Sequence, residues 1–147
     1  MAEGKRGVAI LGIFVADLAF RAGRMPGIGE TIVGSGFKMG PGGKGSNQSV
    51  AAARAGGEVS FIAKLGRDSF GDIALKTWAA DGIDTSQVLI SDEVPTGAAF
   101  IFVSSETGDN AIIVEAGAAG TLTAEDVNLA EKAISGAKVF VTQLETA

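Results

Sequence analysis

The stretch Val8–Ala16 contains no polar side chain and is rich in β-branched residues. A strand with one face in water would alternate apolar and polar residues, so this pattern predicts a strand that is covered on both faces. Such strands belong to parallel sheets flanked by helices. A second run of this kind, Val59–Ala63, follows an alanine-rich helical segment, and this order predicts a right-handed crossover onto a parallel neighbour. The sequence therefore predicts an α/β fold with a mostly parallel central sheet.

Three further segments have the pattern of a small second sheet. Thr31–Met39 alternates like a strand but contains two glycines, which predicts a bent edge strand. Gly97–Val103 and Asn110–Val114 are joined by a polar turn and form a predicted hairpin. The other expected elements are helices at 47–55 (with Ser46 as N-cap), 72–80 (with Trp78 in the core) and from Thr123 to Gly136, and buried strands at 88–90 and 139–141.

Composition argues against several classes of function. The chain of 147 residues has neither cysteine nor histidine, so it offers no thiol nucleophile, no disulfide and no His/Cys metal site. A formal net charge of −5, with no basic cluster beyond Lys5-Arg6, argues against nucleic acid binding. The apolar runs are too short to span a bilayer, and Met1–Gly4 lacks a signal-peptide layout. We therefore expect a cytoplasmic protein that does not bind membranes.

The stretch Gly40–Gly45 is the clearest candidate for a binding site. Glycines let a ligand approach the main chain, and the start of the following helix directs N–H groups toward oxygen-rich ligands. Lys44 and Asn47 add a positive charge and an amide within the same turn. The stretch formally matches the dinucleotide pattern G-x-G-x-x-G but follows an edge strand, and Gly45 stands where a Walker A loop has Ser or Thr. A dinucleotide site and a purely structural loop both stay open as alternatives.

Asp17 closes the first apolar run and has apolar neighbours in the sequence. A carboxylate is costly to bury without partners, so one interpretation is that Asp17 turns toward solvent. The other interpretation is that its acceptor oxygens bind neighbouring hydroxyl groups of a ligand, as a sugar diol would offer. The local pattern is compatible with both.

The segment Gly42–Ala51 (GGKGSNQSVA), followed by Gly66–Gly71 (GRDSFG), resembles the N-terminal signature of the ribokinase-like (PfkB-type) carbohydrate kinases. Gly-Lys-Gly-Ser-Asn-Gln is closer to ribokinase than to its nucleoside or hexose-phosphate relatives. The resemblance implies a Rossmann-like α/β fold with a small β-sheet lid, and an ATP-dependent sugar kinase. Further matches in the same order extend the likeness over nearly the whole chain: Gly27–Thr31, Thr96-Gly97, Glu115–Ala118 and Gln143–Glu145.

The resemblance also implies roles for single residues. Strands within about 14–40 and 97–115 would form a lid that closes over the sugar and pairs with a second subunit in a homodimer. Val15 stands where the family usually has Asn, which removes a hydrogen-bonding group and puts ribose itself in doubt. The residues implied to bind the sugar are Asp17, Gly42, Gly43, Lys44, Asn47 and Glu145.

The family's catalytic aspartate lies in a Gly-x-Gly-Asp motif that this sequence lacks, since Thr107-Gly108-Asp109 has no first glycine. The resemblance places that motif, the ATP pocket and an Mg²⁺-associated Asn-x-x-Glu motif beyond Ala147. No catalytic, cofactor-binding or metal-binding residue is therefore assigned in this chain, although the complete enzyme is expected to use ATP, Mg²⁺ and K⁺.

We accordingly expect residues 1–147 to be the truncated N-terminal, sugar-binding part of a kinase. The complete enzyme would phosphorylate a primary hydroxyl of a pentose or similar sugar, and residues 1–147 would be inactive alone. One alternative is a non-catalytic sugar-binding or dimerisation module. The other is a dinucleotide-binding α/β domain.

Overall fold

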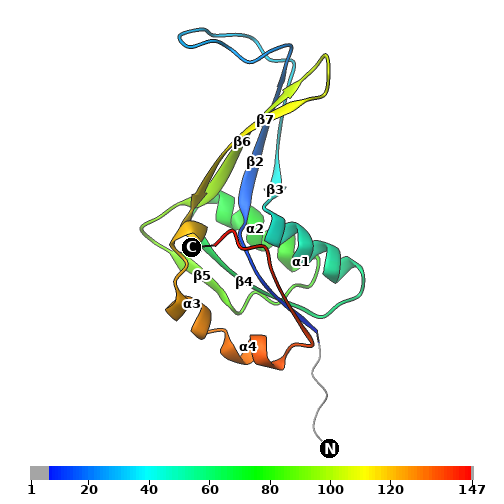
Figure 1. Ribbon diagram of the computed structural model, residues 1–147, viewed down its shortest axis with the longest axis vertical. Helices are drawn as coiled ribbons and strands as arrows, with labels where there is room; N and C mark the ends of the chain where they lie inside the picture. The colour runs from blue at the N-terminus through cyan, green and yellow to red at the C-terminus, as the bar shows by residue number, and fades with distance from the viewer. Residues whose placement is uncertain (1–6, 147) are drawn as a thin grey trace, which may run out of the picture.

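The computed structural model describes residues 7–146 and contains two four-stranded sheets (Figure 1). The first sheet is parallel throughout, in the order β5-β4-β1-β8. It confirms the predicted central sheet, in which β1 and β4 are parallel neighbours. Its strands are β1 (Val8–Leu11), β4 (Val59–Gly66), β5 (Val88–Ser91) and β8 (Val139–Thr142).

Helices cover both faces of the parallel sheet. On one face, Ile10 and Phe61 pack with residues of α1 and α2, and the predicted core residue Trp78 is fully buried among them. On the other face, Ala9 and Ile62 pack against the chain that forms α4. Burial on both sides explains why β1 and β4 carry apolar runs. The helices are α1 (Lys44–Arg54), α2 (Ser69–Ala80), the 3-10 helix η1 (Ala118–Thr121), α3 (Ala124–Asn128) and α4 (Glu131–Gly136).

The second sheet has the order β3-β2-β6-β7 and extends away from the helices (Figure 1). The pairs β2–β3 and β6–β7 are antiparallel, whereas β2 and β6 are parallel. The predicted hairpin and the predicted edge strand are both present. Its strands are β2 (Val15–Ala22), β3 (Gly36–Gly42), β6 (Thr96–Ser104) and β7 (Asn110–Gly117).

The prediction of one continuous strand over Val8–Ala16 is wrong. The run divides between β1 and β2, which belong to different sheets. The residues between them stay buried because Phe14 packs into the core beside Trp78 while Ile13 packs into a separate cluster with Val15. Asp17 consequently lies inside β2 rather than at the end of a strand.

The start of the first helix was also predicted incorrectly. α1 begins at Lys44 with Gly43 as its N-cap residue, so Ser46 lies in the first turn and does not cap it. Ser46 is buried because its hydroxyl oxygen accepts a hydrogen bond of 2.9 Å from the indole Nε1 of Trp78. The preceding strand begins later than predicted, since β3 pairs with β2 only from Gly36 onward.

Two differences affect the last predicted elements. The single helix expected between Thr123 and Gly136 consists of α3 and α4, although Thr123 caps the first of them through a capping box with Asp126. β8 was predicted to be buried, but Val139 and Phe140 are 51% and 43% exposed. Their exposure follows from the position of β8 at the edge of the parallel sheet.

The N-terminal segment Met1–Gly4 and the basic pair Lys5-Arg6 lie outside the described residues, as does Ala147. Within the part of the chain that the structure describes, every helix is either too short or too polar to cross a bilayer.

Asp68 connects α2 to the start of β6. Its carboxylate caps α2 by accepting a hydrogen bond from the backbone N–H of Gly71 (2.9 Å), and it also accepts one from the N–H of Thr96 (2.7 Å). The hydroxyl oxygen of Thr96 in turn accepts a bond from the N–H of Gly66 (2.9 Å). Burial acts to raise the pKa of Asp68, but these N–H donors together outweigh it and hold that pKa below its usual value.

Asp68→Asn is expected to lower the free energy of unfolding at pH 7 by about 1–3 kcal/mol, because the amide Nδ2 cannot accept a hydrogen bond and one of the two N–H donors loses its charged acceptor. Since folding lowers the pKa of Asp68, its contribution is present above the unfolded pKa of about 4 and is lost as pH falls through the folded value. Urea denaturation of the purified protein at pH 7 and pH 3 measures both effects. Asp72→Asn, in the same helical turn but exposed, is the matched control, and an equal loss in both variants would contradict this role.

Candidate functional site

The residues predicted to bind a ligand gather where the two sheets meet. α1 starts directly after β3, and Glu145 follows the carboxyl end of β8. The carboxyl edge of a parallel sheet is where α/β proteins usually bind ligands. Figure 1 shows the C-terminal segment ending beside the base of the second sheet.

Asp17 lies against Gly42 on the neighbouring strand. A Cβ atom built on Gly42 would collide with the carboxylate of Asp17, so only glycine leaves room for that carboxylate. Gly42 is itself buried, and Asp17 is half-buried. Burial raises the pKa of Asp17, and within residues 7–146 no hydrogen-bond donor contacts its carboxylate. Two acceptor oxygens are therefore partly removed from water without a partner in the protein.

Gly43 fixes the position at which α1 starts. Its φ of 89° lies in the left-handed region, and a Cβ atom would come within 2.5 Å of the carbonyl oxygen of Ile13 and 2.8 Å of the Cα of Phe14. The same carbonyl oxygen of Ile13 accepts a hydrogen bond from the backbone N–H of Ser46 (3.2 Å). The close approach and this bond together hold the first turn of α1 against the segment between β1 and β2.

Lys44 forms an ion pair with Glu145, which lies 101 residues further along the chain. The side chain of Lys44 is 72% exposed and that of Glu145 is 27% exposed. Asn47 also lies on α1 and is exposed. The structure thus forms two pairs: Asp17 lies against Gly42, and Lys44 lies against Glu145. Gly43 stands between Gly42 and Lys44 in the sequence and so connects the two pairs. Among the described contacts, the side chain of Asn47 is linked to neither pair.

Asp17 lines a cavity of about 310 Å³. Lys38 on β3 contributes the positive charge of this cavity, and sequence reasoning did not identify it. The signal was available, because Lys38 and Gly40 alternate along the strand and so share a face of the sheet with Asp17. The cavity is lined by Asp17, Ala19, Lys38, Gly40, Pro41 and Ile101.

Val15 does not line this cavity. Its side chain is only 5% exposed and packs with Ile13, Ala99 and Ala119. An amide at this position would therefore need a hydrogen-bonding partner within an apolar cluster.

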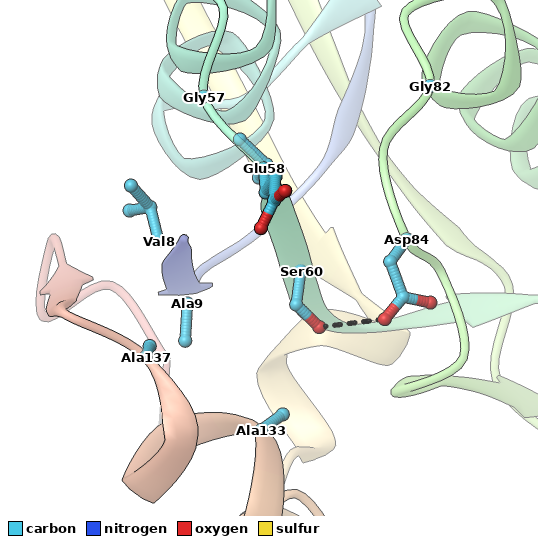
Figure 2. A pocket seen from close by; sticks show the side chains of 10 residues that line it. Val8, Ala9, Gly57, Glu58, Ser60, Gly82, Asp84, Ala133 and Ala137 are labelled. Atoms are coloured by element: carbon cyan, nitrogen blue, oxygen red, sulfur yellow. Dashed lines mark hydrogen bonds between the residues drawn. The ribbon is translucent and has the colours of Figure 1, made fainter. Parts of the chain in front are cut away.

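A larger cavity of about 360 Å³ lies at the opposite, amino-terminal ends of β1 and β4 (Figure 2). Glu58, Ser60 and Asp84 form its polar wall, and the hydroxyl of Ser60 donates a 3.2 Å hydrogen bond to the carboxylate of Asp84. Ala133 and Ala137 form the opposite wall. None of the predicted site residues lines this cavity, so we do not assign the ligand site to it.

Metal-binding side chains do not gather anywhere in residues 7–146, where no group of three or more Asp or Glu residues could hold an ion. The site at the base of the second sheet is therefore built from one free carboxylate, one ion pair, glycine backbone and the start of a helix. These groups can bind hydroxyl groups, since a carboxylate accepts two hydrogen bonds and an ammonium donates them.

Comparison with known proteins identifies close relatives of this chain. Residues 5–143 match the pfkB family of carbohydrate kinases. Ribokinase of Mus musculus is 40% identical over 143 residues, which are 97% of this chain and 44% of the relative. Deoxyribokinase of Salmonella typhi is 36% identical over 141 residues, or 94% of this chain and 45% of the relative. A solved structure of Arabidopsis thaliana ribokinase complexed with ribose and ATP superposes with a TM-score of 0.83 at 26% identity, covering 97% of this chain and 46% of that one. The chain thus spans less than half the length of these relatives.

Proposed function

This chain belongs to the pfkB family of carbohydrate kinases, and we propose on that basis that it forms the sugar-binding part of an ATP-dependent sugar kinase of the ribokinase type. The reaction would transfer the γ-phosphoryl group of ATP to a primary hydroxyl of a pentose or similar sugar. Two of its relatives are a ribokinase and a deoxyribokinase, which supports a pentose-sized substrate.

The observation that carries the proposal is the carboxylate of Asp17. It is half-buried, has no donor within the described residues, and faces a cavity of about 310 Å³. Two neighbouring hydroxyl groups of a sugar would supply the hydrogen bonds that a partly desolvated carboxylate lacks. Gly42 and Gly43 would let the sugar approach the main chain, while Lys44, Asn47 and Glu145 would contact its other hydroxyls.

We also propose that the second sheet acts as a lid over the sugar. Its Asp17 face carries Ala19, Lys38 and Ile101, so a sugar bound at Asp17 would meet this face of the sheet. The two strands next to Asp17 are β3 and β6, which pair with it through Gly40 and Ala99. Closure of such a sheet would exclude water from the hydroxyl to be phosphorylated.

The opposite face of the second sheet, here called the aromatic face, supports the proposal of a homodimer formed through the lid. Phe20 packs against Phe37 and Phe100, with ring centroids 4.8 Å and 5.7 Å apart. Phe37 and Ile113 nevertheless remain 60% and 69% exposed. A contiguous exposed apolar surface on a sheet is typical of a protein–protein interface. By register, the face comprises Leu18, Phe20, Phe37, Met39, Phe100, Phe102 and Ile113.

Phe37→Arg is expected to weaken self-association at least about ten-fold, because a guanidinium would be buried without a partner in the proposed interface. Sedimentation equilibrium of the purified protein measures the change in dimer affinity. Leu129→Arg is the matched control, since Leu129 is 71% exposed but lies near α3, away from the second sheet. A dimer that tolerates Phe37→Arg would contradict an interface on the aromatic face.

We assign no residue of this chain to ATP, Mg²⁺ or K⁺, which the proposed reaction would use. The described residues hold no cluster of acidic groups suited to a cation, and no catalytic base is assigned among them. The part of the reaction supported by this chain is binding and orientation of the sugar. Because the reaction would consume ATP, we place the protein in the cytoplasm.

The experiment that tests the function measures ADP release from ATP by the product of the complete reading frame, with Mg²⁺ and K⁺ supplied. The panel contains ribose, deoxyribose, other pentoses, hexoses and nucleosides. Turnover with one sugar would support the kinase and identify its acceptor. Sugar binding measured by calorimetry without ADP formation would favour a non-catalytic sugar-binding module instead.

A further inference from the structure

Gln143 connects three segments that are far apart in the sequence. Its Nε2 donates a 2.6 Å hydrogen bond to Oε1 of Gln48 on α1, across 95 residues. Its Oε1 is buried and has no hydrogen-bond partner within the described residues. That oxygen lies over Gly12 and Gly45, where it would come within 2.8 Å of a Cβ atom built on Gly45.

The two glycines under Gln143 are in unusually close contact with each other. A Cβ atom on Gly12 would come within 2.8 Å of the Cα of Gly45, and one on Gly45 within 2.7 Å of the Cα of Gly12. Neither position could carry a side chain without a shift of the backbone, so the residue after β1 and the first turn of α1 pack backbone against backbone, and the amide of Gln143 lies over this contact. The side chain of Gln143 is therefore held by its hydrogen bond to Gln48 and by its contact with the two glycines.

The residue that follows Gln143 has an uncommon backbone conformation. Leu144 has a φ of 57°, and it is the only non-glycine residue among those described with a positive φ. Such a conformation costs energy for a branched side chain and persists only where its surroundings enforce it. Leu144 directly precedes Glu145, the residue that forms the ion pair with Lys44.

We propose that Gln143 is a positioning residue for sugar binding, which clamps the end of β8 to α1 and so holds Glu145 against Lys44. This inference rests on the proposed function, in which Lys44 and Glu145 contact the sugar. The ion pair cannot provide this geometry by itself, because exposed ion pairs are weak and Lys44 is 72% exposed. The Gln143–Gln48 bond and the buried amide supply the missing constraint, and they keep Leu144 in its left-handed conformation.

Gln143→Ala is expected to weaken sugar binding roughly three- to ten-fold, the equilibrium effect of losing one constraining hydrogen bond. Isothermal titration calorimetry on the product of the complete reading frame gives the dissociation constant for the best sugar of the panel. Gln48→Ala is expected to cause a similar loss. Gln87→Ala is the matched control, because within residues 7–146 the side chain of Gln87 bonds only its neighbour Ser86 and lies outside the site.

A second comparison separates positioning from general destabilisation. If Gln143 acts by holding Glu145, then Gln143→Ala should cause no further loss of sugar affinity in a protein that already carries Glu145→Gln. A merely structural role would give the same loss in both backgrounds, and that result would overturn the proposal.

Hydrogen–deuterium exchange tests the clamp without any sugar. The peptide covering residues 139–146 should exchange faster in Gln143→Ala and at the original rate in Gln87→Ala. Unchanged exchange in Gln143→Ala would overturn the clamp even if sugar binding is normal. Failure of the wild-type protein to bind any sugar would instead refute the proposed function, and the exchange rates would still decide whether Gln143 holds this segment.

Discussion

Gly43→Ala is expected to lower the free energy of unfolding by about 2–5 kcal/mol and to abolish sugar binding. About 1–2 kcal/mol arises from placing a side chain in the left-handed region, since Gly43 has a φ of 89°. The rest arises from overlap with the Ile13 carbonyl and the Phe14 Cα, which are backbone atoms that can move only with the core, at a cost of about 1–3 kcal/mol. Urea denaturation and calorimetry with the preferred sugar measure the two losses.

Gly56→Ala is the matched control for Gly43→Ala. Gly56 follows α1, has the same φ of 89°, and has no atom within 4 Å of a built Cβ. It therefore reports the cost of a side chain at positive φ without any overlap, about 1 kcal/mol. Equal losses at the two positions would show that contact with Ile13 and Phe14 is unimportant, and normal sugar binding by Gly43→Ala would remove the glycine loop from the site.

Asp17→Asn is expected to weaken sugar binding roughly 10- to 150-fold for each hydroxyl that the carboxylate binds, because hydrogen bonds to charged groups contribute about 1.5–3 kcal/mol. The free energy of unfolding, in contrast to sugar affinity, should not fall in this variant. Burial raises the pKa of Asp17, so the folded state favours the protonated form, and the associated stability is lost as pH rises through the folded pKa. At pH 7 the variant should therefore unfold at the same temperature as the wild type or at a higher one.

Calorimetry with the sugar and thermal unfolding at pH 7 measure these two effects of Asp17→Asn. Gly42→Ala should reproduce the loss of affinity, because its Cβ would displace the carboxylate of Asp17. Asp109→Asn, in the exposed turn between β6 and β7, is the control and should leave sugar affinity unchanged. Unchanged affinity in Asp17→Asn would exclude Asp17 as the sugar ligand.

Much of the fold could be predicted because its signals are local. The apolar runs of β1 and β4 require cover on both faces, and the structure provides it with helices on either side. The caps are local as well, since Asp68 and Thr123 each bond a backbone N–H three residues further along the chain. The sequence carries no local signal for the division of Val8–Ala16 between two sheets. Both halves of the run and the junction between them are buried, so all three are equally apolar.

The candidate site was predictable only in part, because only some of its signals are local in the sequence. Glycine positions and the charges of Asp17 and Lys44 are visible in the sequence, but the partners that orient them are distant. Ser46 was assigned as a cap from local pattern, whereas its true partner is the indole of Trp78, 32 residues away. The bond between Gln143 and Gln48 spans 95 residues and follows no periodicity.

The hydrogen bond between Trp78 and Ser46 gives this protein an optical signal of its own. Trp78 is the single tryptophan of the chain, so its emission comes from one buried indole. That indole donates to a hydroxyl in the first turn of α1, two residues from Lys44 and one from Asn47. A shift of this turn would lengthen or break the bond and change the wavelength and intensity of the fluorescence. Titration of unlabelled protein with a sugar would thus follow the start of α1 directly in solution.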